Sequence, residues 1–314
     1  MKTLILGAGA MGSLFGGRLK QIGVDVTLYN RENDHVKKIN QDGLRILDND
    51  GNMTTVNIPV VSHPYNLSNR YDLIIVLVKA HATDKVLNQV LHTIDEDTAV
   101  LSLQNGIGNL ESVKNAVPYS NVGIGGAGCG GGILENGTVG HRANGRTYIG
   151  FSEGVHSRVS ESIADMFTRS GLPATVTTDI ASIIWSKLII NIAFNGLTAI
   201  TRLSNGNAIA PPEGKEIIKE LVNEAARVAQ AEGIELIYSD PVAECLRLGI
   251  ENIGENKSSM LVDIIKERKT EIDYINGAIV DYGTKNAIPT PYNTLITNLV
   301  KLTEKSYEKI VTDV

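Results

Sequence analysis

Residues 1–12, MKTLILGAGAMG, decide the fold expected for this chain, because a short apolar run leads directly into three glycines at G-x-G-x-x-G spacing. In a strand–turn–helix unit the first glycine permits the tight turn, and the second lets the backbone approach a pyrophosphate. The third glycine allows the helix to pack closely on the strand, and the start of that helix offers N–H groups to phosphate oxygens. The predicted cofactor-binding positions are Gly7, Gly9, Ala10, Met11 and Gly12.

The residues that follow support this prediction, because a helix-compatible stretch at 13–22 and a strand-like run at 24–29 complete a βαβ unit of about 30 residues. A second match to the motif begins at Gly123, but it runs into further glycines at 130–132 and a segment with hairpin character. We expect this second set to serve close backbone approach to a ligand or tight bends, and a second nucleotide site is the less favoured alternative.

The tip of the second strand indicates which dinucleotide binds. A unit that prefers NAD usually carries Asp or Glu there to bind the ribose hydroxyls, whereas an arginine suits the 2′-phosphate of NADP. This chain has Asn30 and Arg31 after Tyr29, with no carboxylate at the strand tip. NADP is therefore the predicted cofactor, with Arg31 as the partner of the phosphate. The alternative is that Arg31 is a solvated surface charge, and Glu32 beside it weakens the prediction.

Composition is typical of a two-domain enzyme in a reducing compartment. The 314 residues exceed the usual size of one domain, and a hydrophobic content of 42% is sufficient for two cores. A net charge of -6 argues against nucleic acid or an anionic membrane as a partner. The two cysteines have no paired spacing and are expected to be inert, and the scattered histidines are expected at the surface or in loops. With no apparent signal peptide and no apolar run of about 18 residues, the protein is predicted to be cytoplasmic.

Two continuous apolar runs, at 72–78 and 98–103, are typical of strands buried on both faces of a parallel sheet. Ligands of such doubly wound sheets lie beyond the carboxyl ends of the strands. Lys79 follows the first run, and Gln104-Asn105-Gly106 follows the second. Both positions are therefore predicted to reach the cofactor or substrate, and the alternatives are a loop lysine and an ordinary Asn-Gly turn.

The last strand-like segment covers residues 172–178, and after Asp179, a candidate N-cap, the pattern is helical to the end of the sequence. Proline and glycine divide this part into predicted helices of about 12 to 22 residues. The predicted fold class is α/β. An N-terminal Rossmann-type doubly wound sheet domain at residues 1–178 is followed by an all-α domain at residues 179–314.

The first helix of the second domain, expected over residues 183–197, is apolar on nearly all sides yet carries Lys187, Asn191 and Asn195. Their i, i+4, i+8 spacing places them on one helical face. An unpaired ammonium in an apolar interior costs several kcal/mol, so this face requires internal partners or a polar cleft. Desolvation lowers the pKa of a buried lysine, which suits general-acid catalysis. The alternative is a lysine paired with a core carboxylate for helix packing only.

A second group of polar residues lies further along the chain, at 258–263 and 269–277. Within it, Glu271 stands at the edge of an amphipathic pattern. It is a candidate partner for Lys187, and the alternative is an ordinary solvated helix charge.

Five motifs together resemble the ketopantoate reductase (2-dehydropantoate 2-reductase) family. They are GAGAMG at the start, VKA around Lys79, QNG around Asn105, WSKLIINIAFNGLTAI over 185–200, and SSMLVD followed by KTEIDYING over 258–277. The last two are long and specific, and the resemblance spans essentially the whole chain.

The resemblance implies an NADP-dependent oxidoreductase. It implies that Lys187 is the general acid that protonates the substrate carbonyl, and that Glu271 is a carboxylate close to that lysine and to the substrate hydroxyl. Asn191, Asn195 and Ser259 are implied to hold substrate oxygens. The implied cofactor contacts are Arg31 and Lys79 on the adenosine side, and Asn105 beside the nicotinamide and the substrate.

Three functions follow as hypotheses. The first is NADPH-dependent reduction of 2-dehydropantoate to pantoate in pantothenate and coenzyme A biosynthesis, and the second is a related reduction of another 2-oxo acid. The third is a non-catalytic dinucleotide-binding redox sensor, which has no need for an acid beside a carbonyl pocket. The expected partner is a small 2-oxo acid rather than nucleic acid or a membrane. No metal is expected, and the chain is expected to be a monomer or a homodimer.

Overall fold

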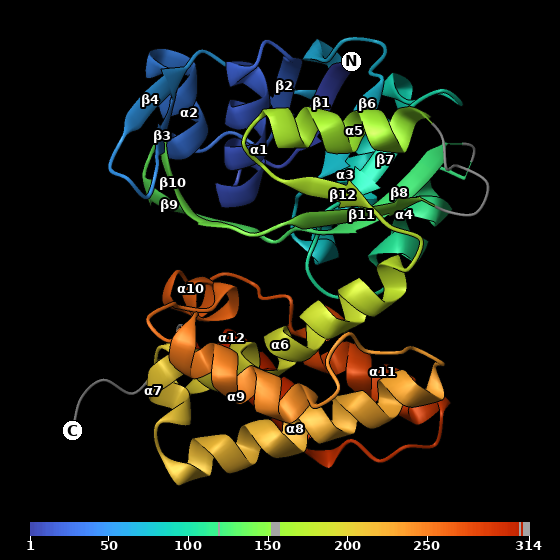
Figure 1. The fold of residues 1–314 in the computed structure, drawn as a ribbon. Helices are drawn as coiled ribbons and strands as arrows, with labels where there is room; N and C mark the ends of the chain where they lie inside the picture. The colour runs from blue at the N-terminus through green and yellow to red at the C-terminus, as the bar shows by residue number, and fades with distance from the viewer. Residues whose placement is uncertain (119, 152–157, 308, 310–314) are drawn as a thin grey trace. The chain divides into compact units, whose positions relative to one another are not determined.

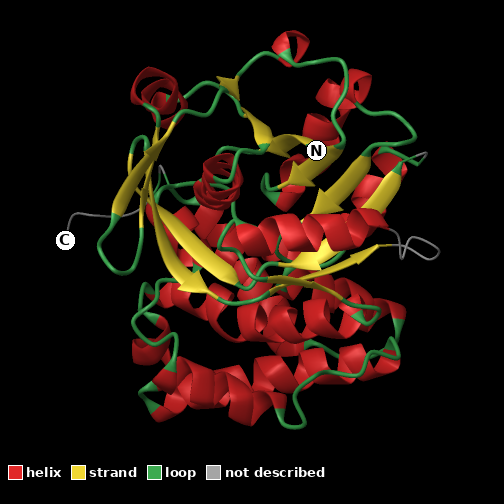
Figure 2. Cartoon of the chain, turned by 45° about the horizontal axis from the view of Figure 1, so that its top comes forward, coloured by secondary structure: helices red, strands yellow, loops and turns green. Residues whose placement is uncertain are grey.

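The computed structural model of this chain describes residues 1–118, 120–151, 158–307 and 309 (Figure 1). It divides into two compact units, the first formed by Met1–Gln104 and Asn109–Ile180, and the second by Asn105–Gly108 and Ala181–Val314. This division lies two residues beyond the predicted domain boundary and assigns the loop at 105–108 to the second unit. Figure 2 shows strands in the first unit and helices throughout the second, which confirms the predicted α/β class with a sheet domain followed by a helical region.

The first unit contains a large, mostly parallel sheet. Among the described residues it has eight strands, namely β1 (Lys2–Leu6), β2 (Asp25–Tyr29), β5 (Val60–Val61), β6 (Leu73–Val76), β7 (Ala99–Ser102), β8 (Asn121–Gly126), β11 (Thr147–Phe151) and β12 (Ala174–Val176). Their spatial order is β12-β11-β8-β7-β6-β1-β2-β5, and β8 and β11 are antiparallel neighbours. The chain leaves β1 toward β2 and returns to the other side of β1 with β6. Ligands of doubly wound sheets bind at such a switch point.

Alternate residues of the central strands pack against helices on opposite faces of this sheet. Ile5 and Ile75 belong to one core with helices α1 and α5, whereas Leu4 and Ile74 belong to another core with α3 and α4. This double burial explains why the sequence of β6 is continuously apolar. The helices of the first unit are α1 (Ala10–Gln21), α2 (Asp34–Asp42), α3 (Thr83–Val90), α4 (Asn109–Ala116) and α5 (Arg158–Arg169), with 3-10 turns η1 (Pro64–Asn66), η2 (Ala80–Ala82) and η3 (Leu91–Thr93).

A smaller sheet with the order β4-β3-β10-β9 packs beside α1. Its strands are β3 (Leu44–Leu47), β4 (Met53–Val56), β9 (Cys129–Glu135) and β10 (Thr138–Asn144). The second glycine motif begins in β8 of the larger sheet. A Cβ on Gly123 would approach the ring of Phe151 to 2.7 Å, and one on Gly125 would approach the carbonyl oxygen of Tyr148 to 2.7 Å. These glycines therefore allow close packing between β8 and its partner strand β11.

Two histidines contradict the expectation that all six lie at the surface or in loops. His35 in α2 and His141 in β10 are both buried. Nε2 of His35 lies 3.2 Å from the hydroxyl of Ser13, and its Nδ1 accepts a hydrogen bond of 3.0 Å from the N–H group of Gly137. Burial lowers the pKa of His141, and the charge of Arg18 acts in the same direction. A neutral, hydrogen-bonded imidazole can be buried, and composition alone does not reveal such partners.

The second unit is helical. Its elements are α6 (Ile180–Thr201), α7 (Asn205–Ile209), α8 (Pro212–Ala231), α9 (Pro241–Glu251), α10 (Ser259–Ile265), the 3-10 turn η4 (Ile272–Tyr274), α11 (Asn276–Lys285) and α12 (Pro291–Lys305). Helices α7 and α10, with 5 and 7 residues, are shorter than predicted. The prolines at 211 and 212 prevent continuation of α7. Beyond α10, Glu267 has a φ of 52°, which a right-handed helix does not accommodate.

Helix α6 is long and apolar enough to cross a membrane when judged by length and composition alone. However, 67% of its most apolar window is buried inside the structure. Ile189, Ile192 and Phe194 are at most 1% exposed and belong to the core of the second unit. Helix α6 therefore behaves as the core helix of this unit.

The N-terminus of α12 is held by a buried carboxylate. Glu224 in α8 is 1% exposed and accepts hydrogen bonds of 2.9 Å from the backbone N–H groups of Tyr292 and Asn293. The side-chain amide of Asn293 donates to the same carboxylate at 2.8 Å and accepts from Asn276 Nδ2 at 3.0 Å. Glu224 thus supplies the cap that the side chain of Thr290 does not provide. Glu224 therefore joins α8 to α12, and Asn293 links this pair to Asn276 at the start of α11.

Glu224→Ala is expected to lower the free energy of unfolding by about 2–4 kcal/mol, because two helix N–H groups and the Asn293 amide lose a buried acceptor. Denaturant unfolding followed by circular dichroism measures this change. Glu216→Ala on the same helix is the control, since that carboxylate is 64% exposed and pairs with Lys219 at the surface. Equal stabilities of the two variants would contradict the capping role.

Candidate active site

The glycine loop between β1 and α1 has the geometry of a strand-to-helix cradle. Gly7 has a φ of 106°, and a Cβ there would lie 2.9 Å from the carbonyl oxygen of Leu77. A Cβ on Gly12 would overlap the carbonyl oxygen of Gly7, so only glycine lets α1 pack on the turn. Helix α1 begins at Ala10 after Gly9, and no described side chain caps it. Its first N–H groups are therefore suited to bind an anionic ligand.

The conformation and surroundings of Gly9 leave space for a ligand beside the loop. Its φ of -79° and ψ of -166° form an extended conformation that any residue adopts. A Cβ there would have no atom within 4 Å. Every other glycine that the structure describes has either a positive φ or an atom within 4 Å of that position. No steric contact or backbone conformation among the described residues therefore requires glycine at position 9, whereas a pyrophosphate that approaches the backbone does.

The tip of β2 supports the glycine loop. Asn30 Oδ1 accepts a hydrogen bond of 3.1 Å from the N–H group of Ala8, and its Nδ2 donates to the carbonyl oxygen of Arg31 at 2.7 Å. The sequence prediction considered Asn30 only as a missing carboxylate and overlooked this role in holding the loop. Arg31 itself is exposed. Its neighbour Glu32 forms an ion pair of 3.3 Å with Lys37, so the carboxylate charge is partly compensated.

Lys79 lies at the carboxyl edge of the sheet, beside the glycine loop. Strands β1 and β6 are parallel neighbours with Leu6 opposite Val76, so the turns that follow them are adjacent. Lys79 is half-buried and precedes η2. Its predicted placement at this edge is confirmed, and its contact with a cofactor stays a prediction.

The segment after β7 is divided between the two units. Gln104 is buried, and its Nε2 donates to the carbonyl oxygen of Val78 at 2.8 Å, which ties the ends of β6 and β7 together. Asn105 begins the loop that belongs to the second unit. In that loop, the N–H group of Ile107 donates to the carbonyl oxygen of Tyr274 at 3.1 Å. The loop of Asn105 therefore packs against η4.

The predicted polar face of α6 is present in the structure. Lys187 and Asn191 are half-buried, and Asn195 is 5% exposed. Nδ2 of Asn195 is buried and has no hydrogen-bond partner within the part of the chain that the structure describes. Leaving a buried donor unpaired costs about 1–3 kcal/mol. This amide is therefore suited to donate a hydrogen bond to an oxygen of a bound ligand.

Glu271 lies in the turn before η4 and is 5% exposed. The alternative of a solvated helix charge is therefore wrong. Gly106, with a φ of 85°, lies so close to this turn that a Cβ on it would overlap the carbonyl oxygen of Tyr274. The structure thus brings the loop of Asn105 and the Glu271–Tyr274 turn together within the second unit. Because these two segments lie far apart in the sequence, their proximity was not predicted.

Ser259 is the first residue of α10, and it is exposed. Its neighbour Ser258 is buried and caps the helix, since Ser258 Oγ accepts a hydrogen bond of 3.0 Å from the N–H group of Leu261. Ser258 belongs to the polar group noted in the sequence at 258–263, but only Ser259 was assigned a substrate contact, and the capping role of Ser258 was not predicted. A serine before an apolar run is a capping pattern that could have identified it.

The predicted site residues form two sets, one in each unit. The first unit carries Gly7, Gly9, Ala10, Met11, Gly12, Arg31 and Lys79, and the second carries Asn105, Lys187, Asn191, Asn195, Ser259 and Glu271. The first set has the backbone donors and cations that bind a phosphorylated cofactor. The second set has an ammonium, a carboxylate, amides and a hydroxyl, which are chemical groups able to bind carbonyl and carboxylate oxygens and to transfer protons.

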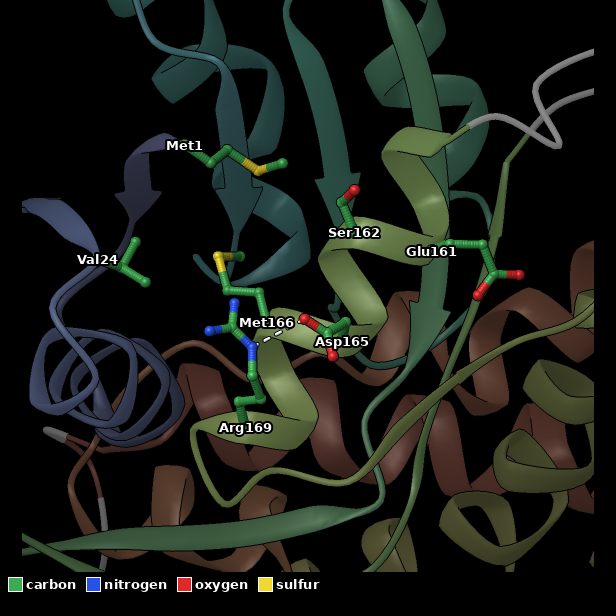
Figure 3. Close-up of a pocket in the computed structure, with 7 residues that line it drawn as sticks. All are labelled: Met1, Val24, Glu161, Ser162, Asp165, Met166 and Arg169. Carbon is green, nitrogen blue, oxygen red and sulfur yellow. Dashed lines mark hydrogen bonds and ion pairs between the residues drawn. The ribbon is translucent and has the colours of Figure 1, made fainter.

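A surface pocket of about 580 Å³ lies in the first unit along α5 (Figure 3). It is lined by Met1, Val24, Glu161, Ser162, Asp165, Met166 and Arg169. Figure 3 shows Asp165 and Arg169 pointing toward each other, and this exposed ion pair has a length of 2.8 Å. None of the predicted site residues lines this pocket, so it belongs to neither residue set.

The cysteines are buried, and burial raises the pKa of the Cys245 thiol to about 12. A thiol with so high a pKa is a poor nucleophile at neutral pH, as predicted for Cys245. Within the described ranges, no group of three or more His, Cys, Asp or Glu side chains is arranged to hold a metal ion.

Comparisons with known sequences match both parts of the chain to one family. The family model described as Ketopantoate reductase PanE/ApbA matches residues 3–154, and the one described as Ketopantoate reductase PanE/ApbA C terminal matches residues 179–304. A 2-dehydropantoate 2-reductase of Pyrococcus horikoshii is 38% identical over 97% of this chain and 98% of its own length.

Solved structures of similar proteins cover nearly the whole chain. The ternary structure of D-mandelate dehydrogenase with NADH and anilino(oxo)acetate has a TM-score of 0.91 at 35% identity, over 98% of this chain and 99% of its own. A PanE/ApbA family ketopantoate reductase from Ralstonia eutropha has a TM-score of 0.89 at 30% identity, over 98% and 100%. With its glycine cradle and the polar face of α6, this chain belongs to the ketopantoate reductase PanE/ApbA family.

Proposed function

We propose that this protein reduces 2-dehydropantoate to pantoate with NADPH, in pantothenate and coenzyme A biosynthesis in the cytoplasm. The observation that carries the proposal is the polar face of the otherwise apolar helix α6. It presents the half-buried Lys187 beside Asn191 and the buried amide of Asn195, whose Nδ2 has no partner among the described residues. Such groups bind the oxygens of a 2-oxo acid and supply a proton. Relatives similar over nearly the full chain are named for this activity.

In this proposal each residue set has its own task. The N–H groups of the first turn of α1 and the open space at Gly9 hold the cofactor pyrophosphate. Bound NADPH supplies the hydride. Lys187 donates a proton to the carbonyl oxygen of the substrate, which becomes the hydroxyl of the product. Asn191, Asn195 and Ser259 orient the substrate oxygens, and the carboxylate of Glu271 sets the hydrogen bonding of the lysine and the substrate hydroxyl.

Arg31→Ala is expected to weaken NADPH binding by about 10- to 100-fold, because a charge-assisted contact to the 2′-phosphate is lost. NADH carries no such phosphate, so its affinity is expected to stay unchanged or to improve. Titration of cofactor fluorescence with the purified variant measures both affinities. Arg45→Ala is the control, since Arg45 pairs with Glu135 across the smaller sheet. Equal losses for the two cofactors would argue against the NADP assignment.

A second candidate function is suggested by the similarity to D-mandelate dehydrogenase, which was solved with NADH. This chain would then reduce an aryl 2-oxo acid, with NADH as the hydride source. The same acid and the same amides would serve this substrate, because they act on the 2-oxo acid group rather than on its substituent.

The test is the loss of reduced-cofactor absorbance with 2-dehydropantoate, phenylglyoxylate and pyruvate, each run with NADPH and with NADH. We expect the highest kcat/KM with 2-dehydropantoate and NADPH. A preference for phenylglyoxylate and NADH would establish the second candidate and reject the first. Cofactor binding without turnover on any of these acids would reject both in favour of a redox sensor.

A further inference from the structure

Helix α6 carries a fourth polar residue on the face of its predicted substrate groups. Thr198 follows Lys187, Asn191 and Asn195 at i+11, i+7 and i+3, which places it on the same side of the helix. Its side chain is fully buried, at 0% exposure. A buried hydroxyl needs hydrogen-bond partners, and the partners of Thr198 show which parts of the fold it connects.

The hydroxyl of Thr198 links α6 to the start of α10. It donates to the carbonyl oxygen of Phe194 at 2.8 Å and lies 2.7 Å from the hydroxyl of Ser258. The Thr198 hydroxyl also lies 3.3 Å from the carbonyl oxygen of Asn195, and in the pair with Ser258 either hydroxyl can be the donor. Ser258 in turn accepts from the N–H group of Leu261 at 3.0 Å. A continuous chain of hydrogen bonds therefore runs from the first turn of α10 to the backbone of α6.

The position of this link determines where the first residue of α10 lies. The body of α10 is fixed by apolar contacts, because Met260, Leu261 and Ile264 are each 1% exposed. Apolar contacts are non-directional, and a helix of 7 residues has little stability of its own. The hydroxyl pair supplies a directional contact at its N-terminus, one residue before Ser259.

We propose that Thr198 and Ser258 are positioning residues, which hold the hydroxyl of Ser259 in register with the polar face of α6 so that one carboxylate substrate can bind both. The inference rests on the proposed function, since it assumes that Ser259 and the amides of α6 bind the same 2-oxo acid. It adds a specific prediction, because a change at a fully buried threonine should alter substrate binding through a serine on another helix.

The experiment compares Thr198→Val, which removes the hydroxyl at nearly constant shape, with Thr198→Ser, which keeps it. Thr198→Val should raise KM for the 2-oxo acid by about 5- to 10-fold, with kcat and KM for the reduced cofactor within about twofold of wild type. Thr198→Ser should restore KM. The matched control is Thr201→Val, because the hydroxyl of Thr201 donates to the Leu197 carbonyl in the same helix at 2.8 Å.

The decisive measurement is the double variant with Ser259→Ala. If Thr198 acts through Ser259, then Thr198→Val should change KM by less than about twofold in the Ser259→Ala background. Multiplicative effects of the two changes, or a Thr198→Val enzyme that loses thermal stability with no change in KM, would overturn the positioning role while leaving the reductase intact. A wild-type protein that turns over none of the 2-oxo acids would overturn the proposed function and this inference together.

Discussion

Lys187→Ala is expected to lower kcat by about 10²- to 10⁴-fold, the usual contribution of a positioned general acid. Lys187 is half-buried on the polar face of α6, and its proposed partner is the carbonyl oxygen of the substrate rather than the cofactor. The dissociation constant of NADPH should therefore stay close to the wild-type value. Steady-state turnover with the preferred 2-oxo acid measures the first effect, and cofactor fluorescence titration measures the second.

Lys187→Arg separates the charge of this residue from its proton. A guanidinium keeps the positive charge but does not donate its proton near neutral pH, so this variant should be nearly as slow as Lys187→Ala. Lys219→Ala, which removes a lysine 50% exposed on α8, should retain full turnover. If Lys187→Arg or Lys187→Ala keeps wild-type turnover, Lys187 is not the general acid.

Gly9→Ala is expected to weaken cofactor binding by about 10- to 100-fold, because the new methyl group occupies the space predicted for the pyrophosphate and removes its contacts with the helix N–H groups. The same change should lower the free energy of unfolding of the cofactor-free protein by less than about 1 kcal/mol, because alanine is a poorer N-cap than glycine but meets no clash there. An alanine fits the extended conformation of Gly9 with no atom within 4 Å, and it reduces the entropy of the unfolded chain. Fluorescence titration and a thermal melt measure the two effects on one sample.

Two other glycines make this experiment specific. Gly132→Ala in β9 should leave both properties intact, because a Cβ there meets its nearest atom, in Arg142, at 3.7 Å. Gly12→Ala should reduce both stability and cofactor binding, because its Cβ would overlap the carbonyl oxygen of Gly7. A Gly9→Ala protein that binds NADPH as tightly as wild type would remove the main structural support for the cradle.

Much of the fold follows from local patterns. The strand-like runs and the glycine spacing predict β1, α1 and β6, because a buried parallel strand and a phosphate-binding turn each have a characteristic sequence. The predicted 183–197 helix is also present, extended at both ends as α6. The length of α10 was overestimated, since its end depends on the backbone conformation of Glu267. The length of α7 was overestimated although Pro211 and Pro212 mark its end in the sequence. The buried histidines were missed because their partners lie far away in sequence.

The sequence by itself determined the order of the sheet and helical regions, the cofactor-binding motif and the polar face of α6. Each of these depends on residues within one turn, strand or helix of one another. Only the tertiary structure decided that Glu271 is buried and that the loop of Asn105 packs against the turn that follows Glu271. The tertiary structure also brings the hydroxyl groups of Thr198 and Ser258 into hydrogen-bond contact. These contacts join segments that lie from 60 to more than 160 residues apart in the sequence. Packing of the helical core brings the segments together, and no local sequence pattern predicts the contacts.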